Sequence, residues 1–252
     1  MEQSPFYGSL SPGAEEPCCR SNCLQVDVFI PGLDIVGGFS LSSTPRQLPL
    51  VQLAVKKANH PPAHWLYSQA KVGDEVGLRV GGSFYHDVWS DKHAATRDLV
   101  FLAGGVGVSP LRSIFRDFIE WMGSSRGRTN PARATLVFSA ASAAELAFRE
   151  EFVAAQRSFG ASRVRLFFTI TKEGVSNELS ASDYFDGAYV HQGRVEPDVI
   201  HRAVAPRPGS QSHRSFSPHV FLCGPPPLVD GAVPVLQDLG IHEHRIRYEK
   251  WW

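Results

Sequence analysis

The stretch that decides the fold is FLAGGVGVSP (Phe101–Pro110), together with its counterpart FLCGPPPLVDG (Phe221–Gly231). Each has an apolar run short enough to be a buried strand, then a tight turn of Gly and Pro, then the start of a helix. The carboxyl ends of parallel strands meet at the edge where open α/β sheets bind their ligands. The sequence therefore predicts that these two turns meet at one ligand site.

The chain around these stretches alternates between strand and helix patterns. The helix after the first turn has apolar residues at helical spacing, namely Leu111, Ile114, Phe115, Phe118, Ile119 and Met122. Four more short apolar runs, at 135–138, 164–169, 219–223 and 245–248, are typical of strands. Residues 96–252 are therefore predicted to form a doubly wound, five-stranded parallel-sheet nucleotide-binding domain. Pro234 predicts a bend or a break in the last helix.

The preceding residues have a different pattern. Between residues 24 and 95 the strands are short and separated by Gly and Pro turns, as in LQVDVFIP and VQLAVKK, which predicts a small antiparallel β-barrel or sandwich. Residues 1–23 show neither helical nor strand periodicity, so an unstructured leader is expected there. The fold class is thus β plus α/β.

The composition gives no sign of a charged partner. The chain has 252 residues, 43% of them hydrophobic, and its 25 Lys and Arg balance 25 Asp and Glu. This balance argues against nucleic acid as a partner, and no apolar run is long enough to span a membrane. The leader contains acidic residues and lacks an apolar core, so it fits neither a mitochondrial presequence nor a secretory signal.

The sequence offers two weak candidates for a metal site. Cys18 and Cys23 are spaced like part of an iron–sulfur motif, but the C-x2-C that should follow is absent. His60 and His64 are one helical turn apart, yet no carboxylate or third ligand is nearby in the sequence. No metal is therefore predicted, and both histidines are interpreted as surface residues.

The two turns have a clear physical use. At Gly104, Gly105 and Gly107 the absent Cβ atoms let a diphosphate approach the backbone. Ser109 as N-cap and Pro110 as the first helical residue would start a helix whose dipole favours an anion. Cys223 then either places its thiol beside a flat ring or is only a small buried side chain.

These motifs resemble a known family. The segments GGFSLSSTP, VGLRVGGSF, GGVGVSP and CGPPP resemble, in order and spacing, the flavin and pyridine-nucleotide domains of the ferredoxin-NADP reductase superfamily. The ending EKWW and the run IPGLDIVGGFSLSSTP resemble most the branch of oxidoreductase NAD-binding domain-containing proteins. The resemblance covers residues 24–252.

The resemblance implies an enzyme, a flavoprotein oxidoreductase that moves a hydride between NAD(P)H and FAD and passes electrons to an acceptor that the sequence does not identify. Ser40, Cys223, Trp251 and Trp252 would lie at the reacting rings. Cofactor contacts are implied for Phe39, Ser40, Ser43, Gly104, Gly105, Val106, Gly107, Val108, Ser109, Pro110, Cys223, Gly224 and Pro225.

The chain also departs from the family pattern. Gly37 stands where relatives have the arginine that clamps the flavin phosphate, and residues 59–64 replace a turn rich in Gly and Ser. Two strands expected before residue 24 have no counterpart in the pattern, so the predicted barrel is truncated. The terminal tryptophans either stack on the flavin or pack the domain boundary.

Three hypotheses remain: an NAD(P)H:flavin oxidoreductase, a catalytically degenerate protein that binds a dinucleotide or a partner without stable flavin, and a product too incomplete to fold. NAD is preferred over NADP because FSAAS (Phe138–Ser142) carries no cation, and Lys172 is the one nearby candidate in the sequence. Mitochondrial localisation is expected from the resemblance, and the cytoplasm is the alternative because the leader lacks presequence features.

Overall fold

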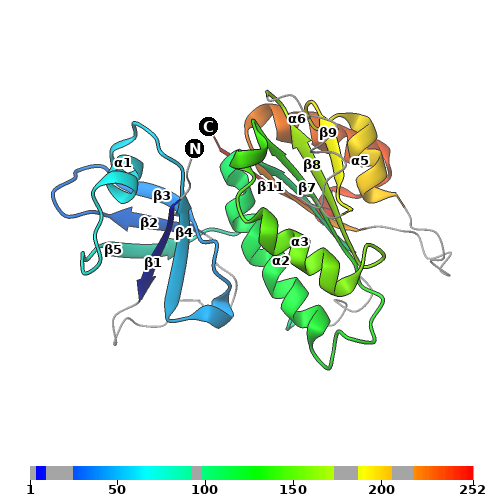
Figure 1. Cartoon of the computed structure of the whole chain (residues 1–252), viewed down its shortest axis with the longest axis horizontal. Helices are drawn as coiled ribbons and strands as arrows, with labels where there is room; N and C mark the ends of the chain where they lie inside the picture. Colours follow the sequence, from blue (N-terminus) through cyan, green and yellow to red (C-terminus); the bar gives the residue numbers. More distant parts are fainter. Residues whose placement is uncertain (1–3, 10–24, 92–97, 173–186, 206–217, 252) are drawn as a thin grey trace.

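The computed structural model describes residues 4–9, 25–91, 98–172, 187–205 and 218–251. The chain forms two domains that lie side by side, an antiparallel one containing β1 to β5 and a larger one built on a parallel sheet (Figure 1). None of the helices in these ranges is long and apolar enough to cross a membrane. The β plus α/β class predicted from the sequence is confirmed.

The parallel sheet has six strands rather than the predicted five. In spatial order they are β11 (Ile246–Lys250), β10 (His219–Gly224), β6 (Leu99–Gly104), β7 (Ala134–Ala140), β8 (Val164–Ile170) and β9 (Tyr189–Gln192). All neighbouring pairs are parallel. The strand missed from the sequence is β9, which adds one edge and has too few buried residues to give an apolar run.

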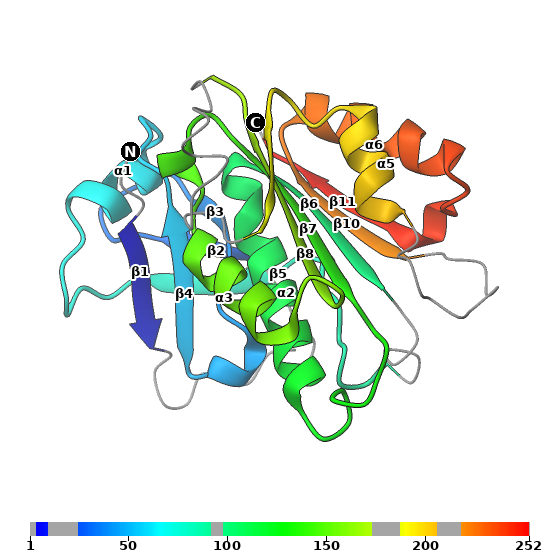
Figure 2. The ribbon, with the colours of Figure 1, turned by 45° about the vertical axis from the view of Figure 1, so that its right-hand side comes forward.

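Helices cover both faces of this sheet, as a doubly wound fold requires (Figure 2). On the face toward the antiparallel domain lie α2 (Val108–Gly123) and α3 (Arg149–Phe159), and on the other face lie α5 (Pro197–Val204) and α6 (Pro226–Asp238). The predicted apolar stripe of α2 is buried against the sheet, and each such large side chain stabilises the fold by roughly 2 kcal/mol.

The chain reverses its direction of winding between β6 and β10. From β6 the strands proceed outward through β7 and β8 to β9, and the chain then crosses back to β10 on the other side of β6. Two adjacent strands whose crossovers lead in opposite directions leave a crevice at their carboxyl ends. That crevice is where the two turns quoted above are found.

α6 contains Pro234 and nevertheless continues to its end at Asp238. Of the predicted bend or break, the break is therefore wrong, and the bend stays a prediction. Pro234 is exposed on the outer side of the helix, so its ring costs a backbone hydrogen bond without disturbing the core.

The antiparallel domain consists of two small sheets around a shared core. One has the order β3 (Gly37–Ser40), β2 (Gln25–Phe29) and β5 (Gly77–Gly81), and the other pairs β1 (Ser4–Ser9) with β4 (Leu50–Val55). A single bridge between Leu41 and Leu53 connects them. The helix α1 (Pro61–Ser68) packs on β3 and β4.

Part of the predicted leader is a strand. Ser4–Ser9 pairs antiparallel with the whole of β4, from Ser4 opposite Val55 to Ser9 opposite Leu50. The expectation of an unstructured segment is wrong for these six residues, because β4 offers an edge that they complete. The rest of the predicted leader lies outside the described residues.

Candidate functional site

The two turns that open the sequence argument meet at the crevice between β6 and β10. Ala103 and Cys223 are neighbours in the parallel register, so the turns that follow them leave the sheet side by side. Gly104 and Gly224 are in direct contact, since a Cβ built on Gly224 would lie 3.1 Å from the Gly104 Cα atom. A Cβ on Gly107 would overlap the carbonyl group of Cys223. The predicted meeting of the turns is confirmed.

The glycine turn is tighter than the sequence suggests. Gly104 ends β6, a short 3-10 turn covers Gly105–Gly107, and α2 begins directly at Val108. Gly105 has a φ of +54°, in the left-handed region that side chains disfavour. Gly105 and Val106 form the exposed tip of the turn, with Val106 39% exposed.

The start of α2 differs from the prediction in one respect. Ser109 is not the N-cap, because Gly107 takes that place and Ser109 and Pro110 lie inside the first turn. Val108, Ser109 and Pro110 are all buried. Their role is to pack the first turn of the helix against the sheet, so the exposed surface of the site comes from the two residues at the turn tip.

The cysteine turn carries a thiol that is paired with an indole. Cys223 is fully buried, and the Trp251 indole nitrogen donates a hydrogen bond to its sulfur at 2.9 Å. The Trp251 backbone N–H donates to the Gly224 carbonyl oxygen, also at 2.9 Å, so the chain end is fixed to the turn twice. Pro225 follows as the N-cap of α6. The predicted Trp252 lies outside the described residues.

Burial decides the state of this thiol. It raises the pKa of Cys223, and the neighbouring Glu249 carboxylate raises it further, whereas the hydrogen bond from Trp251 lowers it. The net direction is upward, so the sulfur is a neutral thiol at physiological pH. A neutral buried thiol is a poor nucleophile, which suits a positioning role.

Glu249 is a site residue that the sequence reasoning did not single out. It lies opposite Cys223 in the β10–β11 pair and is half-buried, and burial raises its pKa. The signal was available, because Glu249 and Trp251 are two residues apart on one strand end and so point to the same side. Among the described residues, Glu249 is therefore the carboxylate that lies beside Cys223 in the β10–β11 pair.

The flavin-motif residues are spread over β3 and the segment after it. Phe39 is half-buried and packs against the core of the antiparallel domain. Ser40 is half-exposed, and its hydroxyl has no hydrogen-bond partner among the described residues. Ser43 is buried, and its hydroxyl accepts the Gln52 backbone N–H at 3.0 Å. Of these two hydroxyls, the one at Ser43 is thus engaged by Gln52, and the one at Ser40 has no such contact among the described residues.

The surroundings of Gly37 do not fit a phosphate group. A Cβ on Gly37 would lie 2.5 Å from a ring carbon of Phe39 and 2.6 Å from the Cβ of Pro62, so the space for a side chain is filled. Pro61 and Pro62 occupy the first two positions of α1 and have no N–H to donate. The space at Gly37 and the start of α1 therefore do not fit a diphosphate tail.

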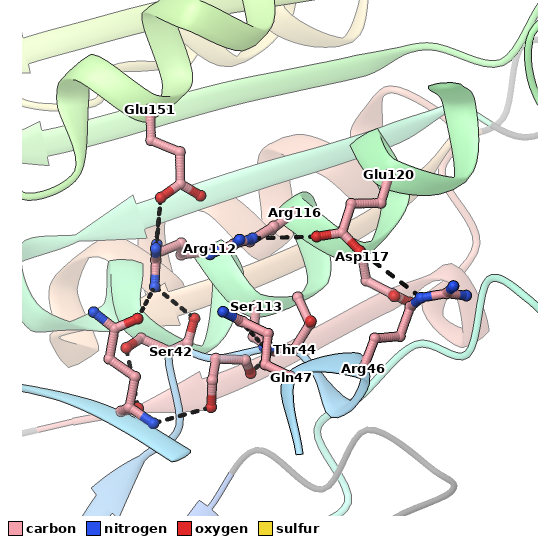
Figure 3. A network of polar contacts seen from close by, with 12 residues as sticks. Ser42, Thr44, Arg46, Gln47, Arg112, Ser113, Arg116, Asp117, Glu120 and Glu151 are labelled. Atoms are coloured by element: carbon pink, nitrogen blue, oxygen red, sulfur yellow. Dashed lines mark hydrogen bonds and ion pairs between the residues drawn. The ribbon is translucent and has the colours of Figure 1, made fainter. Parts of the chain in front are cut away.

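A buried guanidinium joins the two domains next to this strand (Figure 3). Arg112, one turn into α2, donates from one terminal nitrogen to the Ser42 carbonyl oxygen and to Gln52 Oε1, both at 2.8 Å. It also pairs with Glu151 on α3 at 2.5 Å and lies over the ring of Phe148, 4.2 Å from its centroid.

The next helix residue adds to this contact. The Ser113 hydroxyl donates to the Ser43 carbonyl oxygen at 2.6 Å. The segment that follows Ser40 is therefore fixed to the helix that follows the glycine turn. We refer to Arg112 and Ser113 with their partners Ser42, Ser43, Gln52 and Glu151 as the interdomain network. The sequence did not predict it, since its partners are brought together only by the fold.

The remaining candidates lie apart from this site. His60 and His64 are exposed at the start of α1, and no group of three or more His, Cys, Asp or Glu side chains in the described ranges is placed to hold a metal. Lys172 is exposed just after β8, and its backbone N–H donates to Ala141 O at 3.0 Å. This contact brings the lysine backbone to the segment that was predicted to choose between NAD and NADP.

A six-stranded parallel sheet with a glycine turn and a cysteine turn at its switch point, joined to a small antiparallel domain, defines the class of ferredoxin-NADP reductase-like proteins. The chain belongs to the oxidoreductase NAD-binding domain family, whose model matches residues 101–233. It is 35% identical to oxidoreductase NAD-binding domain-containing protein 1 of Danio rerio over 231 residues, covering 90% of this chain and 79% of that protein. The Homo sapiens protein of the same name is 33% identical, with 90% and 69% covered.

Solved structures agree on the fold. A ferredoxin NADP+ reductase from Neisseria gonorrhoeae with bound FAD and NADP superposes with a TM-score of 0.67 at 17% identity, covering 98% of this chain and 92% of that one. The cytochrome b5 reductase domain of Ulva prolifera nitrate reductase gives 0.66 at 17% identity, covering 97% and 90%. The resemblance predicted from the sequence motifs is confirmed.

Proposed function

We propose that this chain is an NAD(P)H-dependent flavin oxidoreductase whose nicotinamide dinucleotide lies at the β6–β10 crevice. The observation that carries the proposal is the direct contact between the glycine turn at Gly104–Gly107 and the cysteine turn at Cys223–Gly224, at the one switch point of the described sheet. The family and the fold support a pyridine nucleotide as the ligand.

The residues of the crevice suit the two halves of the dinucleotide. The tip offers the bare backbone of Gly105 for the diphosphate, beside the exposed side chain of Val106, and α2 begins immediately behind it. The nicotinamide ring would lie over the flat surface of Gly224 and Pro225, beside the Cys223 thiol. We expect this thiol to orient the ring rather than to form a bond with it.

Trp251 occupies the position that controls access to this ring. Its indole is held by Cys223 and its backbone by Gly224, so the side chain covers the cysteine turn. We propose that the indole moves away when nicotinamide enters. Glu249, behind the thiol, would hold a proton more readily than an ordinary carboxylate because burial raises its pKa.

When bound, a flavin supplies an N5 atom that accepts a hydride. In the balanced reaction NAD(P)H, the flavin and one proton give NAD(P)+ and the two-electron-reduced flavin. The chain itself contributes Ser40, whose hydroxyl has no partner in the described ranges and would hydrogen-bond to the ring edge, and Phe39, whose ring supports that strand. The interdomain network keeps Ser40 at a fixed distance from the glycine turn. The electron acceptor that follows is not part of the proposal.

NAD is the proposed dinucleotide. The end of β7 and the residues after it, Phe138–Ser142, carry no cation that would pair with a 2′-phosphate. Lys172 is exposed nearby and is the described cation to test for any residual use of NADP. We expect NADH to be preferred over NADPH.

A second candidate function is dinucleotide binding without turnover. It is favoured by the filled space at Gly37 and by the two prolines at the start of α1, which both argue against a tightly held FAD. The protein would then act as a dinucleotide-binding or partner-binding module.

One experiment separates the two candidates. Purified chain is mixed with NADH or NADPH and FAD in the absence of oxygen, and the visible absorbance of the flavin is followed. The oxidoreductase predicts bleaching at a rate proportional to the chain concentration and faster with NADH. If NADH binds but bleaching stays at the rate without protein, the binding module is correct and the enzyme proposal is wrong.

A further inference from the structure

We propose that this chain recognises a flavin through the isoalloxazine ring alone, so that riboflavin, FMN and FAD bind with similar affinity as exchangeable ligands. The inference rests on the proposed function, because it names the ligand chemistry of the same site. The inference starts from a difference between the two ends of β3. The hydroxyl of Ser40, at the end of the strand, is proposed to meet the ring, whereas the space at Gly37, at its start, does not fit a phosphate.

The direction of β3 decides which part of a bound flavin would lie near each of its two ends. Gly37, at its start, lies against Pro62 of α1, whereas Ser40, at its end, leads into the segment held by Arg112 and Ser113. A flavin ring placed at Ser40 therefore has the nucleotide-binding domain on one side. Its ribityl tail leaves either along β3 toward α1 or outward into solvent.

A tail that follows β3 meets no cation at Gly37. The ring of Phe39 folds back over this glycine, and the Pro62 Cβ closes the space from the helix side. A bidentate guanidinium is the strongest phosphate ligand that a side chain offers, and no such side chain fits here without repacking both neighbours.

The start of α1 does not replace that ligand. Pro61 and Pro62 lack N–H groups, and the His64 N–H is used by the His60 carbonyl oxygen at 2.9 Å. Among the first four helical residues this leaves the N–H of Ala63, which is buried. A helix N-terminus binds an anion through its free N–H groups, and here almost none remain.

The lysines before α1 have other partners. Lys56 forms an ion pair with Glu145 at 2.8 Å, and the Lys57 ammonium lies 5.7 Å from the centroid of the Tyr67 ring. His60 and His64 are exposed side chains at the helix start. Among the described residues around β3 and α1, a phosphate or diphosphate thus meets no built contact, and we infer that the ring contacts carry the affinity.

The test is equilibrium dialysis of the whole chain against riboflavin, FMN and FAD, each at about 50 mM and about 500 mM salt. We expect the three dissociation constants to agree within about threefold, and the FAD constant to change by less than about twofold with salt. Ser40→Ala should weaken all three flavins by the same factor. FAD binding more than about tenfold tighter than riboflavin would overturn the inference and leave the proposed function intact.

Absence of binding by any of the three flavins has a different meaning. It overturns both the inference and the flavin part of the proposed function, so the two failures are distinguishable. Retained NADH binding in the same preparation would show that the chain is folded in this case.

A gain-of-function pair tests the assigned positions. G37R/P62G introduces a guanidinium, removes the Pro62 Cβ and restores one N–H donor, so that the Phe39 ring is the one remaining neighbour that must rotate away from the new side chain. P62G alone restores the donor without the cation. We expect the double variant to bind FAD at least about tenfold tighter than riboflavin, and P62G to show a smaller preference. A double variant that binds riboflavin like the parent chain and gains nothing for FAD contradicts the assignment.

Discussion

Gly107 shows how a single missing methyl group shapes the site. Its backbone touches the carbonyl group of Cys223, so the glycine turn and the cysteine turn are in van der Waals contact. Cys223 belongs to β10, which pairs in register with β6, and Gly107 is the N-cap of α2, so neither backbone group can shift without moving its element. The close approach therefore fixes the width of the crevice in which the dinucleotide is proposed to lie.

Replacing this glycine tests that contact. We predict that Gly107→Ala lowers the free energy of unfolding by about 3 kcal/mol, because the new methyl group overlaps a rigid carbonyl. Gly231→Ala is the matched control. A Cβ there meets nothing within 4 Å, so the same change within α6 should stabilise the chain by about 1 kcal/mol. Urea unfolding followed by tryptophan fluorescence measures both, and equal effects would refute the contact.

Glu249 gives a pH-dependent prediction. Because burial raises its pKa in the folded state, the folded chain binds this proton more tightly than the unfolded chain does. The stability that protonation provides is present at low pH and is lost as the pH rises through the folded pKa. Glu249→Gln should therefore raise the melting temperature at neutral pH.

The same argument predicts how the effect of Glu249→Gln on the melting temperature varies with pH. The difference between Glu249→Gln and the parent chain should shrink toward zero as the pH falls to about 3, below the ordinary pKa of glutamate, where the carboxyl is protonated in both states. Glu243→Gln, at an exposed glutamate, serves as the control and should change little. A Glu249→Gln difference that is constant from pH 4 to pH 8, or reversed in sign, would show that the carboxylate is not buried.

At the scale of elements, the interdomain network relates two strand ends that are far apart in the sequence. Arg112 and Ser113 belong to the helix that follows the glycine turn, and they hold the carbonyl groups of Ser42 and Ser43, just after the flavin-motif strand. Phe148, which lies over Arg112, has a φ of +58°, an unusual conformation for a side chain of this size. Phe148 is the N-cap of α3, and the same helix carries Glu151, which pairs with Arg112 in the interdomain network.

Removing the Arg112 guanidinium tests how much it contributes to the stability of the fold. We predict that Arg112→Met lowers the free energy of unfolding by about 3 kcal/mol, because Glu151, Gln52 and the Ser42 carbonyl lose a buried partner. Arg116→Met, one turn further along the same helix, removes a surface pair with Glu120 and should cost no more than about 0.5 kcal/mol. Differential scanning calorimetry of the two variants gives the comparison, and similar losses would contradict the proposed weight of the network.

Elements with strong local patterns were predictable, and those defined by their neighbours were not. β6 and β10 have fully apolar runs followed by turn residues, so both strands and their meeting follow from the sequence. β9 and β1 are edge strands with weak patterns, and each exists because a neighbouring strand offers an unpaired edge. The interdomain network depends on tertiary contacts alone, for which no local sequence signal exists.

At the scale of the whole molecule, the chain combines an NAD-binding domain with an antiparallel domain that departs from the family pattern at Gly37. The sequence identified Gly37 as a departure from the family pattern, but not its cause. The structure supplies the cause, because Phe39 and Pro62 fill the space that a larger side chain would need. The nucleotide crevice was thus predictable from two turns, whereas the ligand preference of the other domain depends on packing between β3 and α1.

The most direct test of the central claim is calorimetric titration of NADH into a pair of variants at the turn tip. Val106 is 39% exposed at the point where the diphosphate is proposed to lie, so its side chain can change without disturbing the core. We predict that Val106→Glu weakens NADH binding at least about tenfold by charge repulsion, while Val106→Lys binds at least as well as the parent chain. Equal affinities for the two variants would show that the dinucleotide does not lie on this turn.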